Sequence, residues 1–525
     1  MTTMSLPLTL VFVAMATVTM TSSSRILLIP VPHYSHVNMF AVAAETLNKG
    51  GHDVAIMVHD VHARRVEKMN ATVLKYPLSK RATLATVFPN LLKDVADMDE
   101  NILSKGLYFY KHVTVTIDKF CREVLGNDEI MDALRYTKYD LAIVDSDHFL
   151  SCLHYIPYKF DIPRVNLGPF VSPWTYGVYS MPFHEPPAVM EVRSTQLSLP
   201  LRVLSTLTAL FTGNMPTFLG YNGYTYTKTF LPERPAKSVS ELMNEGEITL
   251  ITVETTCFDF PKLSAPHYRF IGSLSATVAP KTLPDYFKIF ADNAKYGLII
   301  VSFGSMVDLR KHIIGSPIHM LIDALGRMKE KAILQFNQTE LCDLKIPSNI
   351  LVTPWLPQLD LLAHPNTKLF ISHGGLNSHL EATHLGVPIL TLPFHLEQAN
   401  NGARAEARGY GKILKWDETN AEEIYNKSRE VIDDKSYKRN IMKCSQIIKD
   451  LPSAREQLSF WVNHVLKHGS KHLRPLSADM SFSQFFGLDV FAVIFSALMI
   501  VLLVFCVCCR FCISTILQSS KQKQD

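Results

Sequence analysis

Three motifs lie close together in the stretch 355–398: W-L-P-Q at 355–358, I-S-H-G-G-L-N-S-H-L-E at 371–381 and L-P-F-H-L-E-Q at 392–398. Short apolar runs at 368–372 and 387–392 predict two buried strands, and the pattern between them, at 376–385, predicts a helix. A strand, a helix and a second strand in this order are typical of a parallel sheet covered by helices.

The turn between the first of these strands and the helix consists of His373, Gly374 and Gly375. The first N–H groups of a helix have no partner within the helix, and the helix dipole is positive at this end. Because glycine lets the backbone come close to a ligand, the turn can stabilise a diphosphate without a metal ion or a lysine. An isolated His-Gly-Gly sequence is usually an ordinary turn, so the prediction depends on the residues around it.

Polar and aromatic side chains near the turn suit the rest of a nucleotide. Asn377 and Glu381 are four residues apart and therefore share one helix face, where they suit a phosphate and the ribose hydroxyls. Trp355 offers a flat face to a base, and Gln358 offers an amide to the edge of that base. A lone Trp is more often a core residue, so Trp355 also counts only together with its surroundings.

Glu397 and Gln398 follow the second strand at the carboxyl end of the predicted sheet, where α/β proteins bind ligands. A carboxylate beside an amide suits the hydroxyl groups of a sugar. Polar groups thus recur at three successive strand ends within 355–398, and this combination predicts a nucleotide-sugar site.

Transfer of a sugar to a hydroxyl group requires a base for the proton of that hydroxyl. His36 is the candidate base because it follows the first predicted strand, 25–31, at the carboxyl edge, and an imidazole accepts a proton near neutral pH. Asp145 ends the predicted strand 140–144 at the same edge and can hold the other ring nitrogen.

Three neighbours remain alternatives to this pair: His33, Asp147 and His148. No D-x-D motif with surrounding strand signals stands out as a site for a divalent ion, so no metal site is predicted. Attack on the face opposite the nucleotide would invert the anomeric centre.

Two doubly wound α/β domains facing each other across a cleft are the expected architecture. The first alternation of strands and helices begins with a strand at 25–31, a helix at 37–49 and a strand at 53–58, and strands are also predicted at 140–144 and 164–167. After a loop at 272–284, the alternation restarts with strands at 297–303, 331–336 and 349–352. We therefore expect an acceptor-binding domain at 25–280 and a donor-binding domain at 281–470.

Both ends of the chain carry apolar segments. Residues 1–24 have the pattern of a cleaved secretory signal, and 490–509 form an uncharged run long enough to cross a bilayer. We expect a juxtamembrane segment at 471–489 and a cytosolic tail at 510–525, with the domains in the lumen. The final K-Q-K-Q-D is similar to the dilysine retrieval signal of the endoplasmic reticulum. In a lumen, the sequons at Asn70, Asn337 and Asn426 are acceptors for glycosylation.

The cysteines do not suggest a disulfide framework. Five of them are scattered and lack metal-binding spacing, which favours buried thiols: Cys121, Cys152, Cys257, Cys342 and Cys444. Four others lie at the membrane edge, where a role as small apolar residues is favoured over acylation: Cys506, Cys508, Cys509 and Cys512. A net charge of only +4, with no basic run among aromatics, argues against a nucleic-acid partner.

The region between Phe170 and Phe230 is rich in aromatic residues, which suits an apolar acceptor such as a phenol, a steroid or a xenobiotic. These residues are Trp174, Tyr176, Tyr179, Phe183, Phe211, Phe218, Tyr221, Tyr224 and Tyr226. A place in the core or facing a membrane is an equally good interpretation of them.

The stretch 355–398 closely resembles the signature of the UDP-glycosyltransferases, and the flanking chain resembles their membrane-anchored UDP-glucuronosyltransferase branch. The resemblance extends to V-S-F-G-S-M at 301–306, H-P-N-T from His364 and G-S-K-H-L-R at 469–474. It implies the two-domain GT-B fold, with the donor held by the C-terminal half. The family usually has Asp-Gln where this chain has Glu397-Gln398, so the carboxylate here reaches one methylene further.

The resemblance also implies a role for each matching residue. Uracil is held by Trp355 and Gln358, ribose by Glu381, and the sugar by Glu397 and Gln398. The diphosphate is held by Ser305, His373, Gly375, Asn377 and Ser378, and His36 with Asp145 forms the catalytic pair.

The expected activity is transfer of a hexose or hexuronic acid, with glucuronate favoured, from a UDP-sugar to a lipophilic hydroxyl. The UDP-sugar is a substrate, and no cofactor is expected. Two alternatives stay open: a glucosyl- or lipid hexosyltransferase, and a catalytically silent luminal binding protein. A homo- or hetero-oligomer is also compatible with the sequence.

Overall fold

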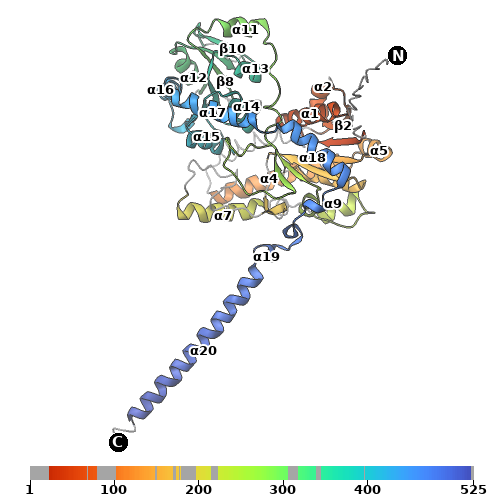
Figure 1. Ribbon diagram of the computed structural model, residues 1–525, viewed down its shortest axis with the longest axis vertical. Helices are drawn as coiled ribbons and strands as arrows, with labels where there is room; N and C mark the ends of the chain where they lie inside the picture. Colours follow the sequence, from red (N-terminus) through yellow and green to blue (C-terminus); the bar gives the residue numbers. More distant parts are fainter. Residues whose placement is uncertain are drawn as a thin grey trace, which may run out of the picture.

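The computed structural model describes residues 23–67, 69–79, 102–147, 150–169, 173–176, 178, 197–213, 223–304, 317–337, 344–394 and 397–521. Two α/β domains lie side by side, and a long helix projects from them (Figure 1). The predicted signal at 1–24 falls almost entirely outside the described residues, as do the last four residues of the predicted tail.

The first domain is built on a seven-stranded parallel sheet with the order β3-β2-β1-β4-β5-β6-β7. Its strands are β1 Arg25–Ile29, β2 Asp53–His59, β3 Thr72–Tyr76, β4 Leu141–Asp145, β5 Arg164–Gly168, β6 Thr249–Ile251 and β7 Tyr268–Phe270. Its helices are α1 Tyr34–Lys49, α2 Asp60–Val66, α4 Ile102–Leu125, α5 Asp128–Tyr136, α6 Tyr155–Lys159, α7 Leu199–Gly213, α9 Gly223–Phe230 and α10 Val239–Asn244. The strand order reverses between β1 and β4, which is where doubly wound sheets open a ligand-binding crevice.

The second domain repeats this arrangement with a six-stranded parallel sheet of order β10-β9-β8-β11-β12-β13. Its strands are β8 Leu298–Ser302, β9 Lys331–Gln335, β10 Ile350–Thr353, β11 Thr367–Ser372, β12 Ile389–Thr391 and β13 Gly411–Ile413. Its helices are α11 Asp285–Asp292, α12 Pro317–Gly326, α13 Gln358–Leu362, α14 Leu376–Leu385, α15 Gln398–Ala407, α16 Ala421–Asp433 and α17 Lys435–Asp450. The reversal lies between β8 and β11, so α14 begins at the crevice of this sheet.

The central strands form because their apolar residues are buried on both faces of each sheet. Residues 26–29 of β1 and 298–301 of β8 have no exposed surface, as expected for parallel strands covered by helices on both sides. The prediction of two doubly wound domains is confirmed, and the predicted helix 376–385 is confirmed as α14 with the same bounds.

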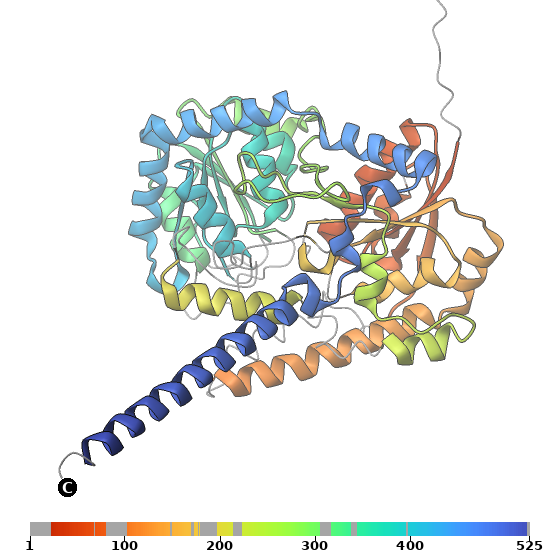
Figure 2. The ribbon, with the colours of Figure 1, turned by 60° about the horizontal axis from the view of Figure 1, so that its bottom comes forward.

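The chain returns to the first domain after α17. Helix α18, Ala454–His468, begins with a capping box formed by Ser453 and Glu456. Its apolar face, including Leu458 and Val462, packs in the cluster that contains β1 and α1 of the first domain (Figures 1 and 2). The sequence placed residues up to 470 in the second domain, whereas burial of this apolar face holds α18 against the first.

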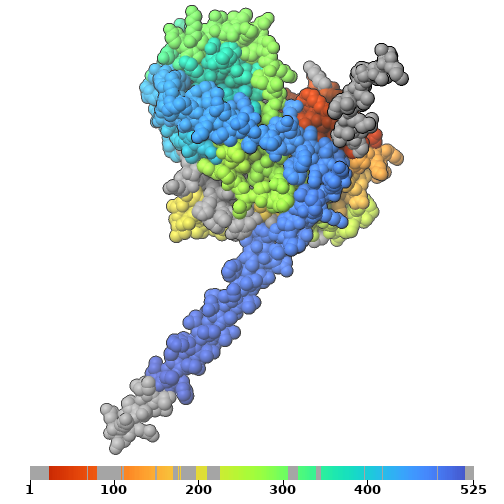
Figure 3. Space-filling view, in the orientation of Figure 1, coloured from red at the N-terminus to blue at the C-terminus, as the bar shows by residue number. Residues whose placement is uncertain are grey.

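Residues after α18 lead to the long helix α20, Leu488–Lys521. They form η5 Lys471–Leu473, η6 Leu476–Asp479 and α19 Phe482–Phe485. Within α20, Leu488–Ser514 contains an 18-residue window with a mean hydropathy of 3.2, and this window is not buried against protein. Figure 3 shows α20 standing clear of the body of the protein. The helix is long and apolar enough to cross a membrane, as predicted for 490–509.

The interpretation of the scattered cysteines as buried thiols was wrong. Cys121 of α4 is bonded to Cys152 of η1, Ser151–His154, within the first domain. Cys257, between β6 and β7, is bonded to Cys444 of α17 and so joins the two domains. Sequence separations of 31 and 187 residues hide both pairings, and an odd number of candidates obscured them further. The fifth candidate, Cys342, lies outside the described residues.

Candidate functional site

The first half of the candidate site lies at the carboxyl edge of the first sheet, where α1 begins and β4 ends. Nδ1 of His36 lies 2.7 Å from Oδ2 of Asp145. The same carboxylate accepts hydrogen bonds from the backbone N–H groups of Val31 and Asp147. These contacts fix the carboxylate, which in turn fixes the imidazole and leaves Nε2 as the ring nitrogen that Asp145 does not engage.

The electrostatics of this pair favour a basic imidazole. Burial alone would lower the pKa of His36, but the charge of Asp145 and its hydrogen bond outweigh burial and raise the pKa to about 9. Burial also raises the pKa of Asp145, and His36 opposes that rise. The carboxylate therefore stabilises the imidazolium that forms when His36 accepts a proton.

His33 is poorly suited to the same role. Burial and the neighbouring His36 lower its pKa to about 4, so this imidazole is a weak base. Its Nδ1 is buried and has no hydrogen-bond partner among the described atoms. Asp147 lies close to the pair, with its Oδ1 accepting the N–H of Leu150, and His148 lies outside the described residues.

The second half of the candidate site is the turn that leads from β11 into α14. Gly374 has a φ of +94°, a conformation that side-chain-bearing residues rarely adopt. A Cβ on Gly375 would come within 2.6 Å of Nε2 of His373, so the imidazole lies directly over this residue. The turn therefore presents backbone N–H groups and one imidazole at the N-terminus of α14, with no aliphatic side chain between them.

Three of the predicted donor residues meet beside α14. Nε2 of Gln358 lies 2.7 Å from Oε2 of Glu381 and 3.0 Å from Oγ of Ser378. Burial raises the pKa of Glu381 to about 7, although the hydrogen bond from Gln358 opposes this rise. Asn377 occupies the second position of α14, one residue before Ser378.

Trp355 lies where the two domains meet. Its side chain is 52% exposed, and the ring of Tyr34 meets it edge-on, with 5.6 Å between the ring centroids. Tyr34 is the first residue of α1, two positions before His36. The residue expected to hold uracil and the residue expected to act as base are therefore linked by one aromatic contact.

Glu397 and Gln398 lie at the start of α15. Glu397 is the N-cap residue, and Oε1 of Gln398 accepts the backbone N–H of Phe394 at 2.8 Å. Burial raises the pKa of Glu397, while Arg404 and His36 oppose the rise. His36 and Glu397 come from different domains, and the attraction between their charges helps to raise the pKa of His36 and opposes the rise in the pKa of Glu397.

Ser305 lies outside the described residues, so its predicted place beside the diphosphate is not described. In the predicted acceptor region, Tyr176 and Tyr226 are buried members of the first domain's core, which favours the core interpretation for these two. The other aromatic side chains of that region are outside what the structure describes.

Two buried polar residues beside the candidate site were not predicted from the sequence. His379 is fully buried on α14, where its Nε2 lies 3.2 Å from Oγ1 of Thr391, and burial lowers its pKa to about 3. Asn401 is buried on α15, and its Nδ2 donates to the carbonyl oxygen of Gly374 at 2.8 Å. The only signal for Asn401 in the sequence was an amide three residues after the Glu397-Gln398 pair, which is too common to be informative.

Comparison with known proteins gives one family over nearly the whole chain. The family profile described as "UDP-glucoronosyl and UDP-glucosyl transferase" matches residues 24–523. The chain is 27% identical to UDP-glucuronosyltransferase 2B33 of Macaca mulatta, over 92% of each chain. It is also 27% identical to UDP-glucuronosyltransferase 2B7 of Homo sapiens, over 95% of each chain.

Solved structures show a similar fold. The glycotransferase of kitacinnamycin has a TM-score of 0.58 at 14% identity, covering 84% of this chain and 99% of its own. The spinosyn forosaminyltransferase SpnP has a TM-score of 0.57 at 17% identity, covering 85% of this chain and all of its own. The two parallel-sheet domains of this chain thus have the arrangement found in GT-B glycosyltransferases.

Proposed function

The chain belongs to the family of UDP-glucuronosyl and UDP-glucosyl transferases, and on that premise we propose that it transfers glucuronate from UDP-glucuronate to a hydroxyl of a small lipophilic acceptor. Sugar transfer from a UDP-sugar is the activity of the family; the sugar, the acceptor and the mechanism are the proposal. The observation that carries it is the 2.7 Å contact between His36 and Asp145, in a domain whose core cluster also includes Leu376 and Leu380 of α14.

In the proposed mechanism, Nε2 of His36 removes the proton of the acceptor hydroxyl. The acceptor oxygen attacks the anomeric carbon from the face opposite the nucleotide, and the bond from that carbon to the diphosphate oxygen breaks. UDP leaves with the bonding electron pair, and the N–H groups at the start of α14 stabilise its charge. Asp145 stabilises the imidazolium. Attack from the opposite face inverts the anomeric centre, so an α-linked donor yields a β-glycoside.

Glucuronate is favoured because the matched relatives named above are UDP-glucuronosyltransferases. One observation favours UDP-glucose as a second candidate donor. Glu397 lies where the sugar is expected, and an ionised carboxylate there would repel the carboxylate of glucuronate. The raised pKa of Glu397 reduces this repulsion by favouring its neutral form.

We further propose that the protein is anchored by α20 in the endoplasmic reticulum membrane, with both domains luminal and the C-terminus cytosolic. The apolar segment Leu488–Ser514 and two disulfides suited to an oxidising lumen support this topology. Protease added to intact microsomes should remove only the tail, and cleavage of the domains would contradict it.

The donor assay offers UDP-glucuronate and UDP-glucose separately to microsomes that contain the protein, each with phenols, steroids and ceramide. We expect the fastest transfer with UDP-glucuronate and a phenol or steroid, giving a β-linked product. Faster transfer from UDP-glucose would identify a glucosyltransferase, and activity on ceramide alone would identify a lipid hexosyltransferase. If the folded protein gave no product with any combination of donor and acceptor, the catalytically silent binding protein would be the remaining interpretation.

A further inference from the structure

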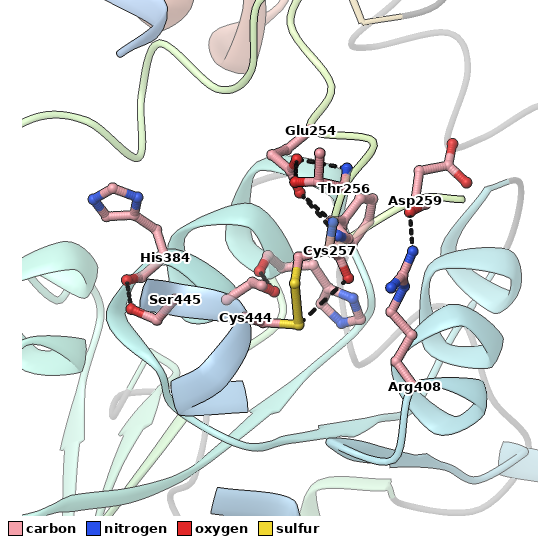
Figure 4. The surroundings of a disulfide bond; sticks show 11 residues. Glu254, Thr256, Cys257, Asp259, His384, Arg408, Cys444 and Ser445 are labelled. Atoms are coloured by element: carbon pink, nitrogen blue, oxygen red, sulfur yellow. Dashed lines mark hydrogen bonds between the residues drawn. A yellow bond between two sulfur atoms is a disulfide. The ribbon is translucent and has the colours of Figure 1, made fainter. Parts of the chain in front are cut away.

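The loop between β6 and β7 joins two strands of the first domain and packs against both domains, with Val253 and Phe258 in the first domain's core cluster. We call residues 252–267 the bridging loop. Cys257 in this loop is buried in the second domain's core cluster and is bonded to Cys444 of α17. The carboxylate of Glu254 accepts the backbone N–H groups of Thr256, Cys257 and Phe258, which makes this part of the loop a compact turn (Figure 4). The loop is therefore fixed in its own shape and fixed to the second domain.

The bridging loop also contacts the helix that begins at the diphosphate turn. The ring of Phe258 meets the ring of His379 of α14 edge-on, with 6.3 Å between centroids. Beside the disulfide, Ser445 donates a hydrogen bond to the carbonyl oxygen of His384 near the other end of α14 (Figure 4). A segment from the first domain thus contacts α14 in its first half and, through Cys444, is joined to a helix that holds its last turn.

Asp259 in this loop begins a chain of polar contacts that ends at the diphosphate turn. Its Oδ1 lies 2.9 Å from Nε of Arg404 on α15, and its other carboxylate oxygen pairs with Lys262. Nη1 of Arg404 donates to Oδ1 of Asn401 at 2.8 Å, and Nδ2 of Asn401 donates to the carbonyl oxygen of Gly374 at 2.8 Å. Asp259 and Asn401 are both buried, so water does not compete strongly for these contacts.

The last contact of this chain determines the direction of a backbone N–H group. The carbonyl of Gly374 and the N–H of Gly375 belong to one planar trans peptide and point in opposite directions. Asn401 holds that carbonyl, so the N–H of Gly375 is directed away from Asn401. Gly374 has no side chain to fix its backbone, and its left-handed conformation makes an external hold more important.

We propose that Asp259 is a positioning residue of the donor site, which acts through Arg404 and Asn401 to fix the Gly374–Gly375 peptide against the donor's diphosphate. This inference rests on the proposed binding of a UDP-sugar at the turn. It makes donor affinity depend on a carboxylate of the first domain, although the donor itself contacts the second. Burial opposes the ionisation of Asp259, but Lys262 and Arg404 outweigh burial and lower its pKa, so the carboxylate is charged at neutral pH.

The test is calorimetric titration of UDP into the full-length protein in detergent. Asp259→Asn keeps the size of the side chain and removes its charge, so it should weaken UDP binding by about tenfold, the loss expected for a charge-assisted hydrogen bond. Asp259→Glu should recover part of the affinity. Glu422→Gln is the matched control, because it breaks an ion pair with Arg327 on the surface of the second domain and should not change UDP binding.

Two further measurements distinguish a positioning role of Asp259 at the donor site from a purely structural role. Asn401→Ala should weaken UDP binding to a similar extent, and Asp259→Asn added to Asn401→Ala should cause little further loss because both act on one peptide. The acceptor KM should not change in Asp259→Asn, since the His36 side of the site is untouched. Unaltered UDP affinity in a folded Asp259→Asn or Asn401→Ala protein would overturn the inference. Failure of the wild-type protein to bind UDP would instead overturn the proposed function.

Discussion

The ring of Tyr34 meets the ring of Trp355 edge-on at a centroid distance of 5.6 Å, which joins the start of α1 to the segment that enters α13. The guanidinium of Arg65 lies 3.7 Å from the centroid of the same Tyr34 ring. Tyr34 is therefore held between a cation of its own domain and an aromatic ring of the other. Because His36 lies two residues further along α1, this contact helps to fix the position of the candidate base relative to Trp355 of the candidate uracil site.

Replacement of Trp355 by alanine should raise the donor KM by about 10- to 100-fold, since stacking of a base on an aromatic ring contributes about 1–3 kcal/mol. Trp355→Phe should retain much of the affinity because a flat face remains. Initial rates at varied UDP-sugar concentration measure the effect. Trp461→Phe, in the first domain beside Arg269, is a control that should leave the donor KM unchanged. Equal donor KM in Trp355→Ala and wild type would exclude Trp355 from the donor site.

The rate should depend on pH through His36. A base must be unprotonated to act, and the Asp145 carboxylate raises the pKa of His36 to about 9 against the effect of burial. The value of kcat/KM should therefore rise from pH 7 to about pH 9. Asp145→Asn removes the charge that stabilises the imidazolium, so the rise of kcat/KM with pH should occur at lower pH. At the same time, kcat should fall by about 10²- to 10⁴-fold. If Asp145→Asn had the same pH profile as the wild-type protein, the assignment of His36 and Asp145 as a catalytic pair would be refuted.

Donor affinity should have a separate pH dependence from Glu381. Burial raises the pKa of this carboxyl to about 7, so it is largely neutral below that pH and ionised above it. An ionised carboxylate is the stronger acceptor for ribose hydroxyls, and the donor KM should fall as pH rises through 7. Glu381→Gln should have a higher donor KM that no longer changes over this range. Retention of the wild-type pH dependence in Glu381→Gln would assign it to another group.

The two disulfides should differ in their effect on the donor site. In the loop-entropy account, closing 31 and 187 residues stabilises a chain by about 4 and 5 kcal/mol, so Cys121→Ser/Cys152→Ser and Cys257→Ser/Cys444→Ser should both lower the Tm. Only the second pair joins the bridging loop to α17. It alone should raise the donor KM, and the Cys121–Cys152 variant serves as the control. Equal donor KM in both double variants would show that the inter-domain bond has no part in donor binding.

Local patterns were enough to predict the elements around the site. The apolar run of β11, the turn glycines and the helical spacing of α14 are adjacent in sequence, so the predicted helix 376–385 is found unchanged. The predicted residues Gln358 and Glu381 prove to be hydrogen-bond partners, although they were chosen for separate contacts with a nucleotide.

Contacts between distant segments were not predictable in the same way. The apolar residues of α18 could pack against an apolar surface of either domain. Its position on the first domain depends on contacts with distant residues, which no local pattern in the sequence encodes. The Cys257–Cys444 bond and the Asp259–Arg404 ion pair join residues more than a hundred positions apart. Single charged residues in loops are usually solvated, so Asp259 carried no signal until its buried partner was known.

The most direct test of the account is a comparison of His36→Ala with the wild-type protein in two measurements on one preparation. These are transfer from labelled UDP-glucuronate to a phenol and equilibrium titration of UDP. We predict that transfer falls by about 10²- to 10⁴-fold, as expected for loss of a general base, while the Kd for UDP stays the same. Transfer at the wild-type rate by His36→Ala would contradict the account.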